Sequence, residues 1–536
     1  MFQRVKQLFR SLLIYGVGDV ATSLVSLLLL PIFTKFLGPS DIGVVIMLLS
    51  VEAVTKVVFR WGVDTAFMRL YYDCTDQAAR QRLASTIFFF MLAVNGTLLA
   101  AGVLSAGWLA TLVLGSRTQS TLIALTMANT FVAGFYFIPY QVLRISNKPK
   151  QYVALTFGRS AGTIVARVLF VLWARWGVFG IVMADVTVTV LQTLVLIRWF
   201  APLIRPVFSR AVAREALGFG LPRIPHSLAQ QVIGVADSYV LRAYGTLADV
   251  GLYGMGARFG VALKLFLSAF ESVWTPFFLA VMREDDAPRT YGMVSTYVVA
   301  VLVLLVAGVC VAAGDLMRLL TEPAFHAAAA VTPWIAIGVM FQGFYLLGSI
   351  GLVIRKRTTV YPITTGMAAV ASVTANLLLV PRFGMIGAAW ANVVAYATLA
   401  IGTTAFSWRL YPIPYEWSRL ARIGVAGGLA YVVATRLVPA SMSPWTGLLV
   451  RGAATVPTYV IVLYLTRFFH AGELQLLQEL RQRTKRQPVV PPPAQTEAEV
   501  ASDVVPGEDE ITMEVERERA DEQAKIVSPD SRPRNR

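Results

Sequence analysis

The chain has 536 residues, of which 56% are hydrophobic and only 15% are charged, and its mean hydropathy is +0.63. This balance excludes an ordinary soluble domain, in which charge is spread along the chain and about half of the residues are apolar. The net charge of +16 would by itself suggest a nucleic-acid partner, but the basic residues gather in alternate loops between apolar runs. We therefore expect a membrane protein that binds no nucleic acid.

Long apolar runs follow one another along almost the whole chain. Runs of about 20 apolar residues cross a bilayer, and they must do so as helices because backbone groups in lipid need internal partners. The first run is too long for the apolar part of a signal peptide and lacks a small-residue cleavage site, so we interpret it as an uncleaved helix. The sequence predicts fourteen spans, at residues 11–36, 42–66, 84–114, 119–143, 153–174, 178–200, 216–243, 250–278, 291–313, 328–353, 360–380, 385–408, 419–438 and 447–468.

Basic residues mark every second loop. The loops after even-numbered spans hold clusters such as Arg80 with Arg82 and Arg355 with Lys356, whereas the other loops hold about one basic residue each. Loops rich in Arg and Lys stay on the cytoplasmic side. This pattern predicts that both termini are cytoplasmic. The tail at 471–536, rich in Pro and acidic residues, is expected to be largely disordered.

One phrase occurs twice. RWGVFGIVMADV (175–186) and RFGMIGAAWANV (382–393) share their frame at an offset of 207 residues, and Asp41-x-Gly43 matches Asp249-x-Gly251 at 208. The shared offset predicts two parallel copies of a six-helix unit, an N-lobe at 1–210 and a C-lobe at 211–410, followed by two further helices at 411–470. Proteins with such repeats bind substrate between the halves. The repeated glycines are interpreted as turn and packing residues, and Asp185 in the first copy is Asn392 in the second.

Ionisable residues inside spans are costly to insert and therefore indicate a polar cavity or a partner. They concentrate on the first two spans of each half, which predicts a hydrated cavity lined by spans 1, 2, 7 and 8. Since guanidinium binds phosphate with paired hydrogen bonds, the excess of basic groups indicates an anionic substrate. The candidate substrate-binding residues are Lys56, Arg60, Arg223, Arg258 and Lys264, and the candidate counter-charges or ion-coupling sites for H+ or Na+ are Asp19, Glu52 and Asp237.

Several simpler interpretations remain open. Arg60 and Arg223 can extend to the cytoplasmic interface without touching substrate, and Glu52 with Lys56 can form an internal pair at helical spacing. The sequence contains no P-loop, HExxH, clustered Cys and His ligands or G-x-S-x-G. We therefore expect no enzyme activity, no cofactor and no metal site.

Four stretches carry a resemblance to a known family: LPIFTKFLGPSDIG (30–43), GVDTAFMRLYYD (62–73), ADVGLYGMGARFG (248–260) and LLLVPRFGMIGAAWANVVAY (377–396). Together they resemble the polysaccharide repeat-unit (O-antigen type) flippases, in the polysaccharide transporter branch of the multidrug/oligosaccharidyl-lipid/polysaccharide exporter superfamily. The resemblance covers nearly all of residues 10–470.

The resemblance implies fourteen helices in two lobes, alternating access and a location in the bacterial cytoplasmic (inner) membrane. It also implies an undecaprenyl-pyrophosphate-linked oligosaccharide as substrate, moved from the cytoplasmic to the periplasmic leaflet. A polysaccharide polymerase and a chain-length regulator are the implied partners. Lys56, Arg60, Arg258 and Lys264 are the residues here that match the cationic lumen of the family.

Three other classes of protein share some of these features. The lipid II flippases of the same superfamily share the fold and a basic cavity, and they remain the main alternative. A drug or cation antiporter would typically have twelve spans, and a basic lumen does not suit it. A membrane glycosyltransferase or polymerase is disfavoured by the internal repeat and by the short non-cytoplasmic loops.

Overall fold

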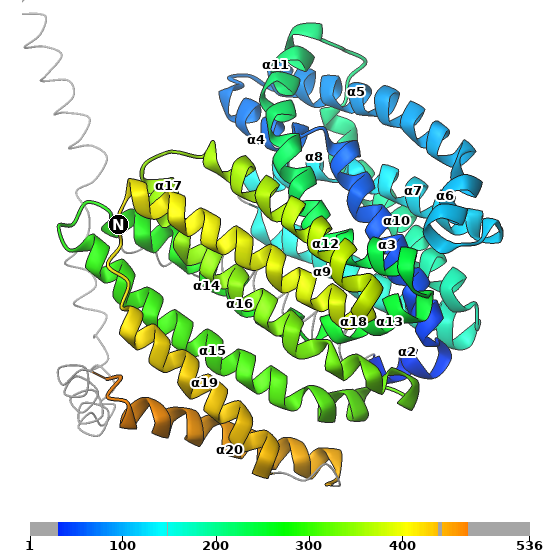
Figure 1. Ribbon diagram of the computed structural model, residues 1–536. Helices are drawn as coiled ribbons and strands as arrows, with labels where there is room; N and C mark the ends of the chain where they lie inside the picture. The colour runs from blue at the N-terminus through cyan, green and yellow to red at the C-terminus, as the bar shows by residue number, and fades with distance from the viewer. Residues whose placement is uncertain (1–29, 147, 438–441, 470–536) are drawn as a thin grey trace, which may run out of the picture. The chain divides into compact units, whose positions relative to one another are not determined.

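The computed structural model describes residues 30–146, 148–437 and 442–469, and these are helical with no strand among them (Figure 1). Helices of the first half follow the predicted spans, several of them in two pieces. Their bounds are α2 Leu30–Phe36, α3 Pro39–Arg60, α4 Val63–Asp73, α5 Gln77–Leu104, α6 Ala106–Leu114, α7 Ser120–Gly134, α8 Phe137–Ile145, α9 Pro149–Val168 and α10 Gly177–Phe200.

The second half repeats this arrangement and adds two helices. Its bounds are α11 Arg210–Gly220, α12 Ile224–Tyr244, α13 Leu247–Arg258, α14 Val261–Val281, α15 Ala287–Leu320, α16 Thr332–Gly348, α17 Ile350–Ile354 and α18 Val360–Leu410, followed by α19 Trp417–Leu437 and α20 Pro444–Leu465. In Figure 1, α15, α19 and α20 lie side by side at one edge of the helical body, and all three pack on one another.

Ten helices in the described part of the chain are long and apolar enough to cross a membrane. One of them, α18, contains two predicted spans. They are separated near Gly384, where the backbone leaves helical geometry. Two more predicted spans, the seventh and thirteenth, are present as α12 and α19. The predicted all-α polytopic membrane fold is confirmed. The number of fourteen spans stays a prediction, since most of the first span, with Asp19, lies outside the described residues.

The repeated phrase has the same backbone shape in both copies. Gly177 and Gly384 each have φ of +55°, a left-handed conformation that glycine adopts at little cost. Three residues later, a Cβ built on Gly180 would lie 3.0 Å from a backbone carbonyl oxygen of the preceding helix, and one on Gly387 would lie 2.3 Å from another. The glycines therefore form a turn and a close helix approach, as interpreted from the sequence.

The second repeated motif joins the two halves. A Cβ on Gly43 of α3 would lie 1.8 Å from the carbonyl oxygen of Leu247 in α13, and a Cβ on Gly251 of α13 would lie 1.9 Å from the carbonyl oxygen of Pro39 in α3. Both residue pairs are related by the offset of 208, so the contact is reciprocal. A local pseudo-twofold axis therefore passes between the first turns of α3 and α13, where small residues let the backbones touch.

The aspartates of the same motif cap these helices. Asp41 Oδ2 accepts a hydrogen bond from the backbone N–H of Gly38 (3.0 Å), and Asp249 Oδ2 accepts one from that of Thr246 (2.8 Å). Each carboxylate thus satisfies a free donor at a helix N-terminus. By the predicted topology this end of α3 and α13 faces away from the cytoplasm, so the two halves are closed together there.

At its other end, α3 stops and the chain turns into α4. Trp61 and Gly62 have φ of 49° and 67°. A Cβ on Gly62 would lie 2.4 Å from the carbonyl oxygen of Gly220, the last residue of α11. The first helix of the second half, α11, also packs on α4 and α5 of the first half. The halves therefore touch near both ends of α3.

Candidate functional site: charged residues between the two halves

Four charged residues follow one another on α3 and α4. Lys56 Nζ lies 2.5 Å from Glu52 Oε1, and Arg60 Nη1 lies 3.6 Å from Asp64 Oδ2. The ion pairs that the spacing of four residues predicts are present. The helix nevertheless ends between Arg60 and Asp64, so the four residues do not form one continuous helical row. Nearly half of the Lys56 and Arg60 side chains is exposed, at 46% and 48%, which leaves both able to meet a ligand.

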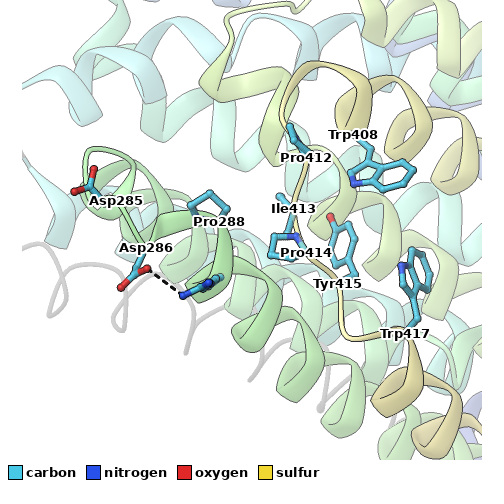
Figure 2. Close-up of a pocket in the computed structure, with 10 residues that line it drawn as sticks. Asp285, Asp286, Pro288, Trp408, Pro412, Ile413, Pro414, Tyr415 and Trp417 are labelled. Carbon is cyan, nitrogen blue, oxygen red and sulfur yellow. Dashed lines mark ion pairs between the residues drawn. The ribbon is translucent and has the colours of Figure 1, made fainter.

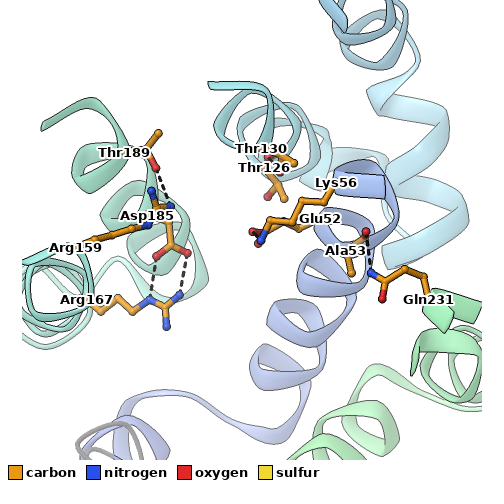
Figure 3. A network of polar contacts seen from close by, with 10 residues as sticks. All are labelled: Glu52, Ala53, Lys56, Thr126, Thr130, Arg159, Arg167, Asp185, Thr189 and Gln231. Carbon is orange, nitrogen blue, oxygen red and sulfur yellow. Dashed lines mark hydrogen bonds and ion pairs between the residues drawn. The ribbon is translucent and has the colours of Figure 1, made fainter. Parts of the chain in front are cut away.

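Helices α12 and α13 of the second half pack directly on α3. Gln231 Nε2 of α12 donates a hydrogen bond to the carbonyl oxygen of Ala53 (3.0 Å), next to Glu52 in the chain (Figure 3). The predicted spans 2, 7 and 8 thus come together as the repeat implied. A cavity that they line is still a prediction, as is the contribution of span 1.

Asp237 is buried in α12. Its carboxylate accepts hydrogen bonds from the Tyr253 hydroxyl of α13 and from the backbone N–H of Ser238. Lys264 of α14, in the same half, is exposed. A buried acid with a satisfied hydrogen-bond shell suits a counter-charge, so Lys264 is the member of this pair that can reach a ligand.

Arg258 and Arg223 are placed differently. Arg258 is half-buried at the last position of α13, and in the described part of the chain it has no ion-pair or hydrogen-bond partner. Arg223 is exposed in the short turn Leu221–Arg223 between α11 and α12. For Arg223 and Arg60, extension to the cytoplasmic interface therefore remains an alternative to substrate contact.

A second charged pair lies in the first half. Arg167 of α9 and Asp185 of α10 form two parallel hydrogen bonds, Nε to Oδ1 at 3.1 Å and Nη2 to Oδ2 at 2.9 Å (Figure 3). Both line a cavity of about 30 Å³ together with Glu52 of α3. Another lining residue is Asn129 of α7. Its buried side-chain amide oxygen has no hydrogen-bond partner among the described residues. Charged, polar and apolar side chains share the lining, and the cavity has room for about one or two waters.

The sequence singles out only one member of this pair, since Asp185 stands where the second copy of the repeat has Asn392. Nothing in the sequence pairs Asp185 with Arg167. Helices α9 and α10 form a hairpin around the turn at Gly177, which brings their charged faces together. Only that packing makes the two residues partners.

A second pocket lies away from these charges. It has a volume of about 670 Å³ and is formed by the loop before α15 and the segment joining α18 to α19 (Figure 2). Trp408, Tyr415 and Trp417 line one side, and Asp286 forms an ion pair with Arg289 at 3.8 Å on the other. By the predicted topology it is a cytoplasmic loop pocket outside the membrane-spanning region.

The described residues contain no group of three or more His, Cys, Asp or Glu side chains that could hold a metal ion.

Comparison with solved structures defines the class of fold. The chain is similar to a lipid II flippase, MurJ, in an inward closed conformation, with a TM-score of 0.69 at 15% identity, over 85% of this chain and 99% of that one. It is also similar to an inward-facing multidrug transporter of the MATE family (TM-score 0.57, 14% identity, 76% and 99% covered). A transporter of the same MOP superfamily from Pyrococcus furiosus matches at 0.53 and 15% identity, over 78% and 96%. These likenesses show the transporter fold.

Sequence comparison then gives the family. Residues 32–330, more than half of the chain, match the family described as polysaccharide biosynthesis protein, and the chain belongs to it. Protein 1 of the Lsg locus of Haemophilus influenzae is 21% identical over 296 residues, which cover 52% of this chain and 67% of that protein. The resemblance drawn from the sequence is confirmed at the level of this family.

Proposed function

We propose that this protein flips an undecaprenyl-pyrophosphate-linked oligosaccharide from the cytoplasmic to the periplasmic leaflet for surface polysaccharide synthesis. The observation that carries the proposal is that helices bearing basic residues pack together from both halves. Lys56 stands on α3 and Arg258 on α13, which pack on each other, and Lys264 stands on α14, which follows α13 in the chain. The polysaccharide family and the transporter fold support the same function.

The mechanism follows from the two halves. Basic groups hold the anionic head while the polyprenyl chain stays in lipid. Separation of α3 from α13 then opens the outer end, and closure at the cytoplasmic end exposes the head to the other side. Binding that is equal in both states moves nothing, so an H+ or Na+ gradient, or consumption by a polymerase with its chain-length regulator, must bias the cycle. The substrate is moved unchanged, with no enzymatic step.

A lipid II flippase is the second candidate function. Its support is the fold match to a lipid II flippase. A diphosphate head and a polyprenyl chain are common to both substrates, so the charged residues alone do not separate them. An antiporter for cationic drugs would need acidic rather than basic groups, which disfavours that function here.

The proposal is tested in cells that depend on this protein for surface polysaccharide. Changing Lys56, Arg258 and Lys264 together to Gln should abolish export while the protein is still present in the membrane at normal level. The matched control changes two lysines and one arginine that are exposed at a helix end or in loops, Lys35, Lys148 and Arg283, to Gln. It should export normally.

Normal surface polysaccharide in the first triple variant would contradict the role of the basic residues. Rescue of cells depleted of their own lipid II flippase, without any effect on polysaccharide, would instead favour the second candidate.

A further inference from the structure

The second predicted span is broken in the structure. Helix α3 ends at Arg60 and α4 begins at Val63. Between them, Trp61 has φ of 49° and ψ of 16°, a left-handed conformation that is costly for a residue with a side chain. A non-glycine residue keeps this conformation only where its surroundings hold it in place.

Asn95 of α5, which is 1% exposed, holds the break. Its Nδ2 donates a hydrogen bond to the carbonyl oxygen of Phe59 (2.7 Å), and its Oδ1 accepts one from the indole N–H of Trp61 (2.9 Å). In a continuous helix the Phe59 carbonyl oxygen would accept from the backbone N–H four residues later. Asn95 therefore satisfies the acceptor that the break frees, and it also fixes the strained residue.

The backbone at the break touches the second half of the protein. A Cβ built on Gly62 would lie 2.4 Å from the carbonyl oxygen of Gly220, the last residue of α11, and one built on Gly220 would lie 2.6 Å from that of Trp61. Neither glycine thus has space for a side chain. The contact lies at the end of α3 opposite to Gly43, which by the predicted topology is the cytoplasmic end.

Helices α4, α5 and α11 share one hydrophobic cluster. Phe67 of α4, Ile87 of α5 and Ala216 of α11 are buried in it. The break sets the direction in which α4 continues from α3. If the second span became one straight helix, α4 would therefore leave its place beside α11.

We propose that Asn95 is a positioning residue for closure of the cytoplasmic end. By holding the break at Trp61, it presents bare backbone to Gly220, and the two halves fit together at this end only while the break persists. Loss of the Asn95 hydrogen bonds lets Trp61 return to a helical conformation, and the halves then separate there. This closure is a property of the protein without substrate, so it holds whichever lipid-linked molecule is carried.

The experiment measures the distance between two spin labels in the purified full-length protein without substrate. The labels replace the exposed residues Tyr72 of α4 and Thr358 of the second half, after both cysteines of the chain have been changed to Ala. Asn95→Leu should shift this distance distribution to longer values, because the break loses both hydrogen bonds. A second pair of labels at the exposed outer residues Ser40 and Tyr244 should show no lengthening.

Two further variants separate positioning from a general loss of stability. Gly220→Ala should give the same cytoplasmic shift, because its Cβ meets the Trp61 carbonyl oxygen while the φ of −79° at this position suits any residue. Adding Trp61→Gly to Asn95→Leu should bring back most of the short distances. Glycine adopts the left-handed conformation at little cost, so it keeps the break without the amide.

Thr130→Val is the matched control. Thr130 of α7 is also 1% exposed, and its hydroxyl donates to the carbonyl oxygen of Thr126 within the same helix (2.8 Å). Its loss should leave the cytoplasmic distances unchanged. Should Asn95→Leu fail to fold, Trp61→Phe removes only the indole N–H and keeps a ring beside Phe90, and it should give a smaller shift in the same direction.

Unchanged cytoplasmic distances in Asn95→Leu, even with a lower Tm, would overturn the inference, because the amide then only stabilises the fold. A double variant that stays as open as Asn95→Leu alone would overturn it too, as would equal lengthening at the outer labels. None of these measurements uses the lipid-linked substrate, so they can fail while its transport is confirmed, and the reverse.

Discussion

Charged residues in the membrane-spanning helices serve two different purposes. Arg451 of α20 and Asp315 of α15 form a buried ion pair that joins the added C-terminal helices to the second half, with 14% and 2% of the two side chains exposed. Lys56 and Lys264 are exposed and lie on helices near the contact between the halves. Burial therefore separates charges that hold helices together from charges able to reach a ligand.

The buried pair gives a prediction on stability. Arg451→Gln leaves the Asp315 carboxylate buried without its charged partner, so it should cost about 3 kcal/mol or more. The loss is measured as a lower Tm of the purified protein in detergent. Replacing both residues together, Arg451→Met with Asp315→Leu, should recover most of the loss, because neither charge then remains buried. If the Arg451→Gln variant were as stable as the unchanged protein, the ion pair with Asp315 would not be what attaches α20 to α15.

Helices α3 and α13 carry the contact most directly tied to conformational change. Their first turns touch through Gly43 and Gly251, with no space for a side chain at either position. Alternating access requires this crossing to open. The state described here is therefore the one in which the outer ends of the halves are together.

Enlarging one of these glycines should open the crossing. Gly43→Val should separate the outer ends, because even a Cβ would lie 1.8 Å from a backbone oxygen of α13. Spin labels at the exposed residues Ser40 and Tyr244 would report longer distances. Gly251→Val should give the same shift, since the contact is reciprocal.

Gly96 of α5 provides the control for this experiment, because nothing lies within 4 Å of a Cβ built there. Gly96→Val should leave the label distances unchanged. An unchanged distribution in the Gly43 variant would mean that the crossing is not the closed outer gate.

At the scale of the whole molecule, the sequence predicted what depends on local pattern. The turn glycines Gly177 and Gly384 follow from a repeated short motif, and the structure has them. The second repeated motif also proves to have one local role in both copies, since Asp41 and Asp249 cap their helices. Contacts between segments that are distant in the chain could not be predicted from such local motifs. The break after Arg60 depends on Gly220, more than 150 residues away in the chain, and no local pattern encodes that distance.

The same limit applies to the charges. Asp237 and Lys264 were recognised as unusual intramembrane residues, but the burial of Asp237 depends on Tyr253 from the next helix. Arg167 and Asp185 became partners only through the packing of α9 on α10. Which charges are satisfied and which are accessible is a property of the fold, so the candidate site residues remain predictions for experiment.

We propose that basic residues from both halves carry a lipid-linked oligosaccharide across the bilayer, and transport of this substrate can be measured. It is tested most directly with the purified protein in liposomes that contain a fluorescent undecaprenyl-pyrophosphate-linked oligosaccharide, by following loss of fluorescence to a quencher outside. The unchanged protein should expose the labelled head of inner-leaflet molecules, and the variant with Lys56, Arg258 and Lys264 changed to Gln should not. Equal rates in the variant, the unchanged protein and empty liposomes would contradict the account.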